Sequence, residues 1–128
     1  MVRFGSLLVG LALLLVPARA DDTERAFLAG NGAAMDRMMK GMAVKPSGDV
    51  DRDFVNMMEP HHQGAIDMAV LELRYGRNEQ LRRIAQEIIV EQQQEIDAMR
   101  LALGRKLPPS APAPTTPDKP MRGMTTPH

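Results

Sequence analysis

The 128-residue chain contains no cysteine and no tryptophan, and it has only one tyrosine and three phenylalanines. The absence of cysteine excludes disulfides and thiolate metal sites. Lysine plus arginine and aspartate plus glutamate each number 16, so neither sign of charge dominates. Because proteins that bind nucleic acid usually carry a basic stripe, we expect no nucleic-acid partner.

The N-terminal residues 1–20 have the pattern of a secretory signal peptide. A basic start is followed by an apolar run at residues 4–16, too short for a membrane span, and by small residues up to Ala20. We expect cleavage after Ala20 and a periplasmic or secreted mature chain without a membrane span. Loss of two arginines leaves 14 basic against 16 acidic residues, a net charge of −2. The alternative is an uncleaved N-terminal anchor, which also places the remaining chain outside the cytoplasm.

Helical periodicity of apolar residues occurs three times along the rest of the chain, whereas strict alternation does not occur. The predicted helices run from about Thr23 to Val44, from Val50 to Tyr75 and from Glu79 to Leu103. The connection between the second and third helices has only about three residues, so these helices are predicted to be antiparallel neighbours.

Several residues mark where these helices begin and end. Asp49 and Asn78 are suitable N-caps, because their side chains can accept hydrogen bonds from the first-turn amides. Gly76 and Gly104 suit left-handed C-terminal stops. Pro60 lies inside the second helix and predicts either a kink or a fresh helix start at the histidines that follow.

The predicted fold is therefore all-α: an antiparallel bundle of three long helices at residues 21–106, followed by a Pro-rich, disordered tail at 107–128. Three helices leave one wide apolar face, so dimerisation is one way to complete the bundle. The tail also contains Met121, Met124 and His128, which are either a loose soft-metal trap or ordinary polar tail residues.

Two of the three histidines, His61 and His62, are adjacent in the second helix and are surrounded by methionines. Met58 precedes His61 by about one turn and Met68 follows it by two turns, so all three share a face. Imidazole and thioether are soft neutral ligands of the type that suits Cu(I) or Ag(I). Because adjacent helical residues point about 100° apart, we expect one histidine to be a ligand and the other a supporting or alternate one.

Methionine is unusually abundant, with 11 residues against four aromatic ones. A single methionine is more often a core filler than a ligand, and a Met-rich surface can also bind a partner's apolar helix. Met38 and Met42 of the first helix and Met99 of the third are the candidates to complete a metal site. Counting outward from the short connection places Gln92 and Glu95 level with the histidines, where either side chain could hold the free nitrogen of a metal-bound imidazole.

Glu59 and His62 form an E-x-x-H pattern, which supplies di-iron ligands in ferritin-like bundles. The pattern occurs once here, whereas such a site needs two of them and further glutamates. The chain also has no nucleophile–base–orienter set and no glycine-rich phosphate loop. We therefore do not expect an enzyme.

The chain resembles the family called domain of unknown function 305 over about residues 27–103. The motifs are M-x-x-H-H-x-x-x-x-x-M at 58–68 and Q-x-x-E-I-x-x-M at 92–99. The resemblance implies an exported protein of ferritin-like helical architecture, and some members are implicated in periplasmic copper and silver binding. The family's motif residues fall on Met58, His61, His62, Met68, Gln92, Glu95 and Met99. One departure is that Arg100–Leu103 replaces a segment that commonly begins with an aromatic residue.

The sequence thus leads to one main functional hypothesis and one alternative. The main hypothesis is an exported protein that binds Cu(I), or silver, for buffering, resistance or transfer to a periplasmic copper-handling protein. Met58, His61 and Met68 are the principal expected ligands. The alternative is an interaction module without metal, which self-associates or binds a partner through its Met-rich face.

Overall fold

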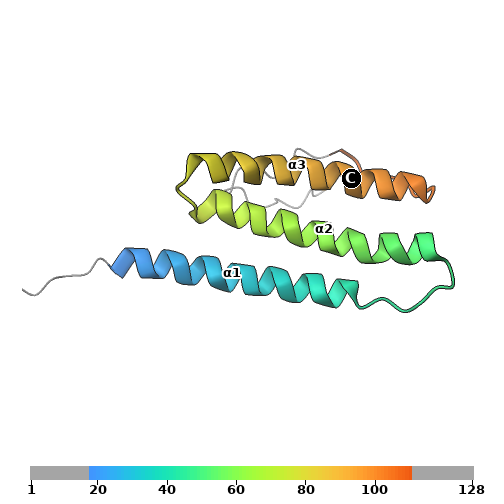
Figure 1. The fold of residues 1–128 in the computed structure, drawn as a ribbon, viewed down its shortest axis with the longest axis horizontal. Coiled ribbons are helices and arrows are strands. Elements are labelled where there is room, and N and C mark those ends of the chain that lie inside the picture. The colour runs from blue at the N-terminus through green and yellow to red at the C-terminus, as the bar shows by residue number, and fades with distance from the viewer. Residues whose placement is uncertain (1–17, 111–128) are drawn as a thin grey trace, which may run out of the picture.

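The computed structural model describes residues 18–110, with side chains from residue 22 onward. The described chain is all-helical, with α1 at Ala18–Met42, α2 at Val50–Tyr75 and α3 at Glu79–Ala102 (Figure 1). This confirms the predicted three-helix fold. Within this part of the chain no helix has the length and apolar character needed to cross a membrane. Most of the predicted signal peptide and of the tail, including Met121, Met124 and His128, lies outside the described residues.

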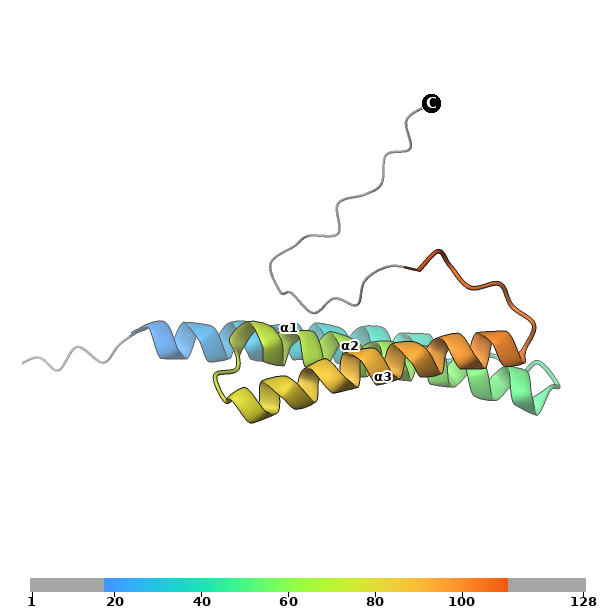
Figure 2. The same cartoon turned by 90° about the horizontal axis from the view of Figure 1, so that it is seen from above.

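The three antiparallel helices lie side by side in one layer, with α2 in the middle. α1 and α3 each pack against α2, and within the described residues they do not contact each other. Figures 1 and 2 show this layer from its face and along its edge. The bundle is therefore open, and α2 is the only helix that contacts both of the others.

The predicted N-caps are confirmed. The Asp49 side chain accepts a hydrogen bond from the Arg52 amide at 3.1 Å, and the Asn78 side chain accepts from Gln80 and Leu81 at 2.9 and 3.1 Å. These bonds satisfy amides of the first turn, which have no partner inside the helix. The sequence thus correctly locates the start of α2 and of α3.

The helix ends differ in part from the prediction. Gly104 has the expected left-handed backbone, with φ +68°, but the prediction for Gly76 is wrong, because its φ is −71°. A Cβ at position 76 would lie 2.0 Å from Glu72 Oε1, so the position is crowded by that side chain. Arg82 of α3 donates to the carbonyls of Leu73 and Gly76 and so caps the end of α2 from outside.

Pro60 does not interrupt α2, which is continuous from Val50 to Tyr75. Of the two expectations for this proline, a fresh helix start at His61 is therefore wrong. The proline ring packs against α1, since a Cβ built on Gly41 would lie 2.5 Å from Pro60 Cβ. Pro60 thus belongs to the contact between α1 and α2.

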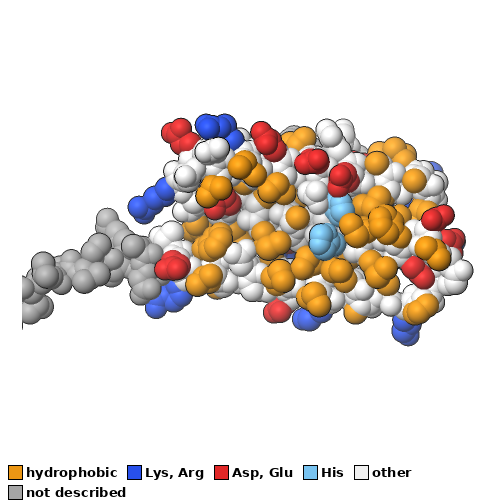
Figure 3. All heavy atoms as spheres, in the orientation of Figure 1, with side chains coloured by type: hydrophobic (Ala, Val, Ile, Leu, Met, Phe, Trp, Pro, Cys, Tyr) orange, Lys and Arg blue, Asp and Glu red, His pale blue; other side chains and the backbone are white. Residues whose placement is uncertain are grey.

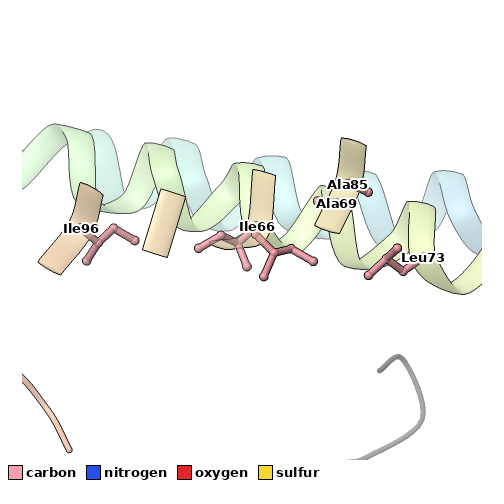
Figure 4. Packing of buried hydrophobic residues seen from close by; sticks show 6 residues of the cluster. Ile66, Ala69, Leu73, Ala85 and Ile96 are labelled. Atoms are coloured by element: carbon pink, nitrogen blue, oxygen red, sulfur yellow. The ribbon is translucent and has the colours of Figure 1, made fainter. Parts of the chain in front are cut away.

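The main hydrophobic core lies between α2 and α3 (Figure 4). Ile89 is completely buried, and the other members of the cluster are almost so: Ile66, Ala69, Leu73, Ala85 and Ile96. Their spacing of three, four and seven residues places them on one stripe of each helix. Burial of these stripes fixes the rotation of α2 about its own axis.

Small residues bring α1 close to α2. A Cβ on Gly64 would lie 2.8 Å from Met38 Sδ, so only glycine leaves room for this methionine. On the edge of the contact, Arg37 Nη2 donates to Asp67 Oδ2 at 2.8 Å. Close backbone approach and one ion pair therefore position the end of α1 beside residues 60–67 of α2.

We predict opposite effects for two glycine substitutions in α1. Gly41→Ala should destabilise the fold by about 1–3 kcal/mol, because the new methyl group meets the rigid Pro60 ring. Gly32→Ala should stabilise it by about 0.5–1 kcal/mol, because nothing lies within 4 Å and alanine favours the helix. Urea denaturation of both variants measures the difference, and equal effects would contradict this account of the α1–α2 contact.

A second prediction concerns the connection between α1 and α2. Hydrogen bonding from Ser47, first by its side chain and next by its backbone amide, holds the pKa of Asp53 below its ordinary value. The Ser47 amide nitrogen lies 3.0 and 3.1 Å from the two carboxylate oxygens of Asp53. A lowered folded-state pKa stabilises the fold above the unfolded-state pKa, and this contribution is lost as pH falls through the folded-state value. Asp53→Asn should therefore flatten the acid limb of a stability–pH curve measured by thermal unfolding. Asp51→Asn, without a bond of this kind to Ser47, is the control and should leave the curve unchanged.

Candidate metal centre

Helical spacing divides α2 into faces with different neighbours. Ile66, Ala69 and Leu73 point to α3, whereas Pro60 and Gly64 point to α1. A third face has no packing partner among the described residues, and we call it the Met–His stripe. It consists of Phe54, Met57, Met58, His61, Ala65 and Met68. Figure 3 shows the histidines on the face of the layer where hydrophobic side chains gather over all three helices.

His61 is an exposed imidazole in the middle of this stripe. Its ring lies 5.8 Å from the His62 ring, and it makes no hydrogen bond within the described part of the chain. Met57 precedes it by four residues and Met58 by three, and Met68 follows by seven, so these thioethers lie on the same side of α2. His61 therefore offers a nitrogen without a hydrogen bond in the described chain, on the side of α2 that also carries these three methionines.

His62, in contrast, is buried, with 6% of its surface exposed. Its Nδ1 lies 2.8 Å from the Met58 carbonyl oxygen and its Nε2 lies 2.6 Å from Glu95 Oε2. A backbone carbonyl can only accept, so Nδ1 carries a proton and donates it. Nε2 then either donates to the carboxylate or accepts from a protonated one. In both cases each ring nitrogen is engaged, and His62 offers no free lone pair.

Glu95 joins His62 of α2 to α3, in agreement with the count across the short connection between these helices. The same oxygen, Oε2, also accepts from Gln92 Nε2 at 3.4 Å. Both residues were expected to support an imidazole. Glu95 binds His62 rather than His61, and Gln92 is connected to that ring only through Glu95. The His62–Glu95 bond thus acts as a polar link between α2 and α3 at the level of the site.

The other expected ligands lie around the same segment of α2. Met38 contacts Gly64, and Met42 follows Gly41, which lies beside Pro60. Met99 is partly buried and packs on the core between α2 and α3. The half-buried Met38 thus lies against the segment of α2 that carries His61, and Met42 lies about one turn further along α1, whereas Met99 belongs more to the core.

Glu59, the acidic member of the E-x-x-H pattern, is held by two arginines. Its Oε1 accepts from Arg105 Nη1 at 3.1 Å and from Arg100 Nε at 3.3 Å. Arg105 also donates to Asn56 at 2.8 Å, so the cluster ties the end of α3 to the first half of α2. This carboxylate neutralises arginines, and His62, the other member of the pattern, points to Glu95.

The described residues contain no group of three or more His, Cys, Asp or Glu side chains arranged to hold a metal ion. The donors around His61 are thioethers instead. Met57, with 38% exposure, is one that the expected ligand set left out, although its spacing of four residues from His61 was a sufficient signal. The donor set suits a soft monovalent ion better than a hard divalent one.

A family model described as Domain of unknown function (DUF305) matches residues 16–103. Among curated proteins, none matches the chain. The matched region contains all three helices and the Met–His stripe.

We predict that the His62–Glu95 bond stabilises the fold. His62→Ala should cost about 2–3 kcal/mol, because it removes a buried ring and leaves the Met58 carbonyl without its partner. Glu95→Ala should cost about 1 kcal/mol, since this side chain is half exposed. The double variant should cost less than the sum of the two, as measured by urea denaturation. Glu91→Ala, one turn away, is the control and should change stability by less than about 0.5 kcal/mol.

Proposed function

The chain belongs to the DUF305 family, and from this premise and the geometry of α2 we propose that it is an exported protein that binds Cu(I) or Ag(I). Its role would be to buffer the ion, to confer resistance to it, or to pass it to a periplasmic copper-handling protein. The observation that carries the proposal is the exposed His61, whose ring lacks a hydrogen-bond partner in the described chain and lies in a stripe of methionines.

The ligand chemistry supports this proposal. Thioethers and a neutral imidazole are preferred by soft monovalent ions, and they bind without losing a proton in the case of methionine. A chain without cysteine also avoids disulfide formation in an oxidising compartment. Met58, Met68 and His61 are the principal ligands in this proposal, with Met57, Met38 and Met42 available beside them and Met99 beneath.

The two adjacent histidines have different roles in this proposal. His61 binds the ion, whereas His62 holds α2 against α3 through Glu95. Export is part of the proposal, because residues 1–20 have the pattern of a secretory signal peptide.

A specific observation also favours the second candidate, an interaction module without metal. Leu28 and Met39 of α1, Phe54 of α2, and Leu81 and Ile84 of α3 are large apolar side chains with 43–60% of their surface exposed. Extended apolar surface of this kind usually marks a protein-binding site. The two candidates differ in whether His61 affects a metal affinity.

We predict that His61→Ala lowers the affinity for Cu(I) at least tenfold, because it removes the only nitrogen ligand of the stripe. The same loss is expected for Met58→Leu combined with Met68→Leu, which keeps the volume and removes both sulfurs. An anaerobic titration of Cu(I) against a competing chelator measures both affinities.

The matched control for this titration is His128→Ala, which removes a histidine far away in the sequence. It should leave the affinity unchanged. Equal weak binding by the unaltered chain and by His61→Ala would overturn the copper proposal and favour the interaction module. A loss caused by His128→Ala instead would move the site to the C-terminal segment.

A further inference from the structure

The exposed apolar face of the layer is about as large as one side of a protein–protein interface. By helical spacing, seven exposed apolar side chains lie on the same side of the layer as His61: Leu28, Met35, Met39, Phe54, Met57, Leu81 and Ile84. Their exposed fractions run from 38% to 60%. At roughly 200 Å² for a large side chain, they present on the order of 700 Å². This approaches the ~800 Å² that each partner contributes to a standard interface.

The opposite face of α2 is polar, so along this helix the exposed apolar side chains lie on the side of His61. Arg52, Asn56, Gln63 and Asp67 follow one another there at helical spacing, and Gln63 donates to Asp67 at 3.0 Å. Of the two sides of α2, the one that carries His61 therefore offers the apolar surface that a protein partner could bury.

The Met–His stripe is complementary to itself about His61. An antiparallel copy of α2 with His61 opposite His61 places Phe54 opposite Met68 and Met57 opposite Ala65. The small Ala65 leaves room for the long Met57 side chain, and a thioether packs well against an aromatic ring. Each of these contacts occurs twice, as a two-fold interface requires.

The helix dipoles favour the antiparallel orientation. Antiparallel copies bring the partly positive N-terminus of each α2 near the partly negative C-terminus of the other, whereas parallel copies place like ends side by side.

We infer that a second copy of this chain covers the apolar face, α2 antiparallel on α2, so that the two His61 rings meet at the two-fold axis and bind one Cu(I) together. The shared binding rests on the proposed copper function, whereas the interface does not. Two imidazoles and the two Met58 thioethers give the ion the nitrogen and sulfur ligands that one chain supplies only in part. Met68, a principal ligand in the proposed site of one chain, packs in this dimer against the partner's Phe54.

Single-cysteine variants of the full chain test the interface, because the chain has no other thiol. His61→Cys should form a disulfide-linked dimer under diamide at least tenfold faster than Gln63→Cys, whose position lies on the polar face. Phe54→Lys should convert the dimer to a monomer in sedimentation equilibrium. Val90→Lys is the control and should not, because Val90, although exposed and apolar, lies among the polar residues Gln86, Glu87 and Gln94 and not on the face with His61. A monomeric unaltered chain, or equal cross-linking at both positions, overturns the interface.

Copper titration of the same proteins separates this inference from the proposed function. A shared site predicts one Cu(I) per two chains and at least tenfold weaker binding by Phe54→Lys, although His61, Met58 and Met68 are intact in it. One Cu(I) per chain, bound equally by Phe54→Lys, overturns the shared site and leaves the copper function standing. A dimer that cross-links through residue 61 and binds no copper overturns the copper function and the shared site, and supports the interface alone.

Discussion

The packing of α2 against two helices at once is the constraint on which the other features of this structure depend. α1 and α3 each contact α2 and, in the described residues, do not contact each other. One side of α2 must therefore carry branched apolar residues for α3, such as Ile66 and Leu73, and another must carry a residue as small as Gly64 for α1. Two sides of α2 remain between these contacts: one is polar, and the Met–His stripe lies on the other.

Much of this architecture follows from local sequence signals. Helical periodicity and the N-caps Asp49 and Asn78 predict the three helices, because capping depends on side chains within three residues of the helix start. Counting across the short connection also predicts that Glu95 lies opposite the histidines. The count works because two antiparallel helices joined by a short loop advance at the same rate per residue.

The sequence signals fail where a tertiary contact decides the outcome. The backbone of Gly76 is not left-handed, and a Cβ there would instead meet the side chain and the carbonyl oxygen of Glu72, a contact of which the periodicity of α2 contains no sign. Likewise, the adjacent histidines are equivalent in the sequence. Only the packing of α3 shows that Glu95 binds the ring of His62 and leaves that of His61 without such a partner. Periodicity also could not predict that the layer is open, because it identifies the apolar face of a helix and does not show what packs against that face.

The buried His62 and the exposed His61 are connected by the geometry of the helix. The bonds of His62 to the Met58 carbonyl and to Glu95 hold its side chain between α2 and α3. Since successive residues of a helix point about 100° apart, fixing His62 inward directs His61 to the uncovered side of the layer. The same rotation brings Met57, Met58 and Met68 to that side. The polar link inside the fold is thus a condition for the free imidazole outside it, and a sequence with one histidine in place of the pair would lose either the link or the ligand.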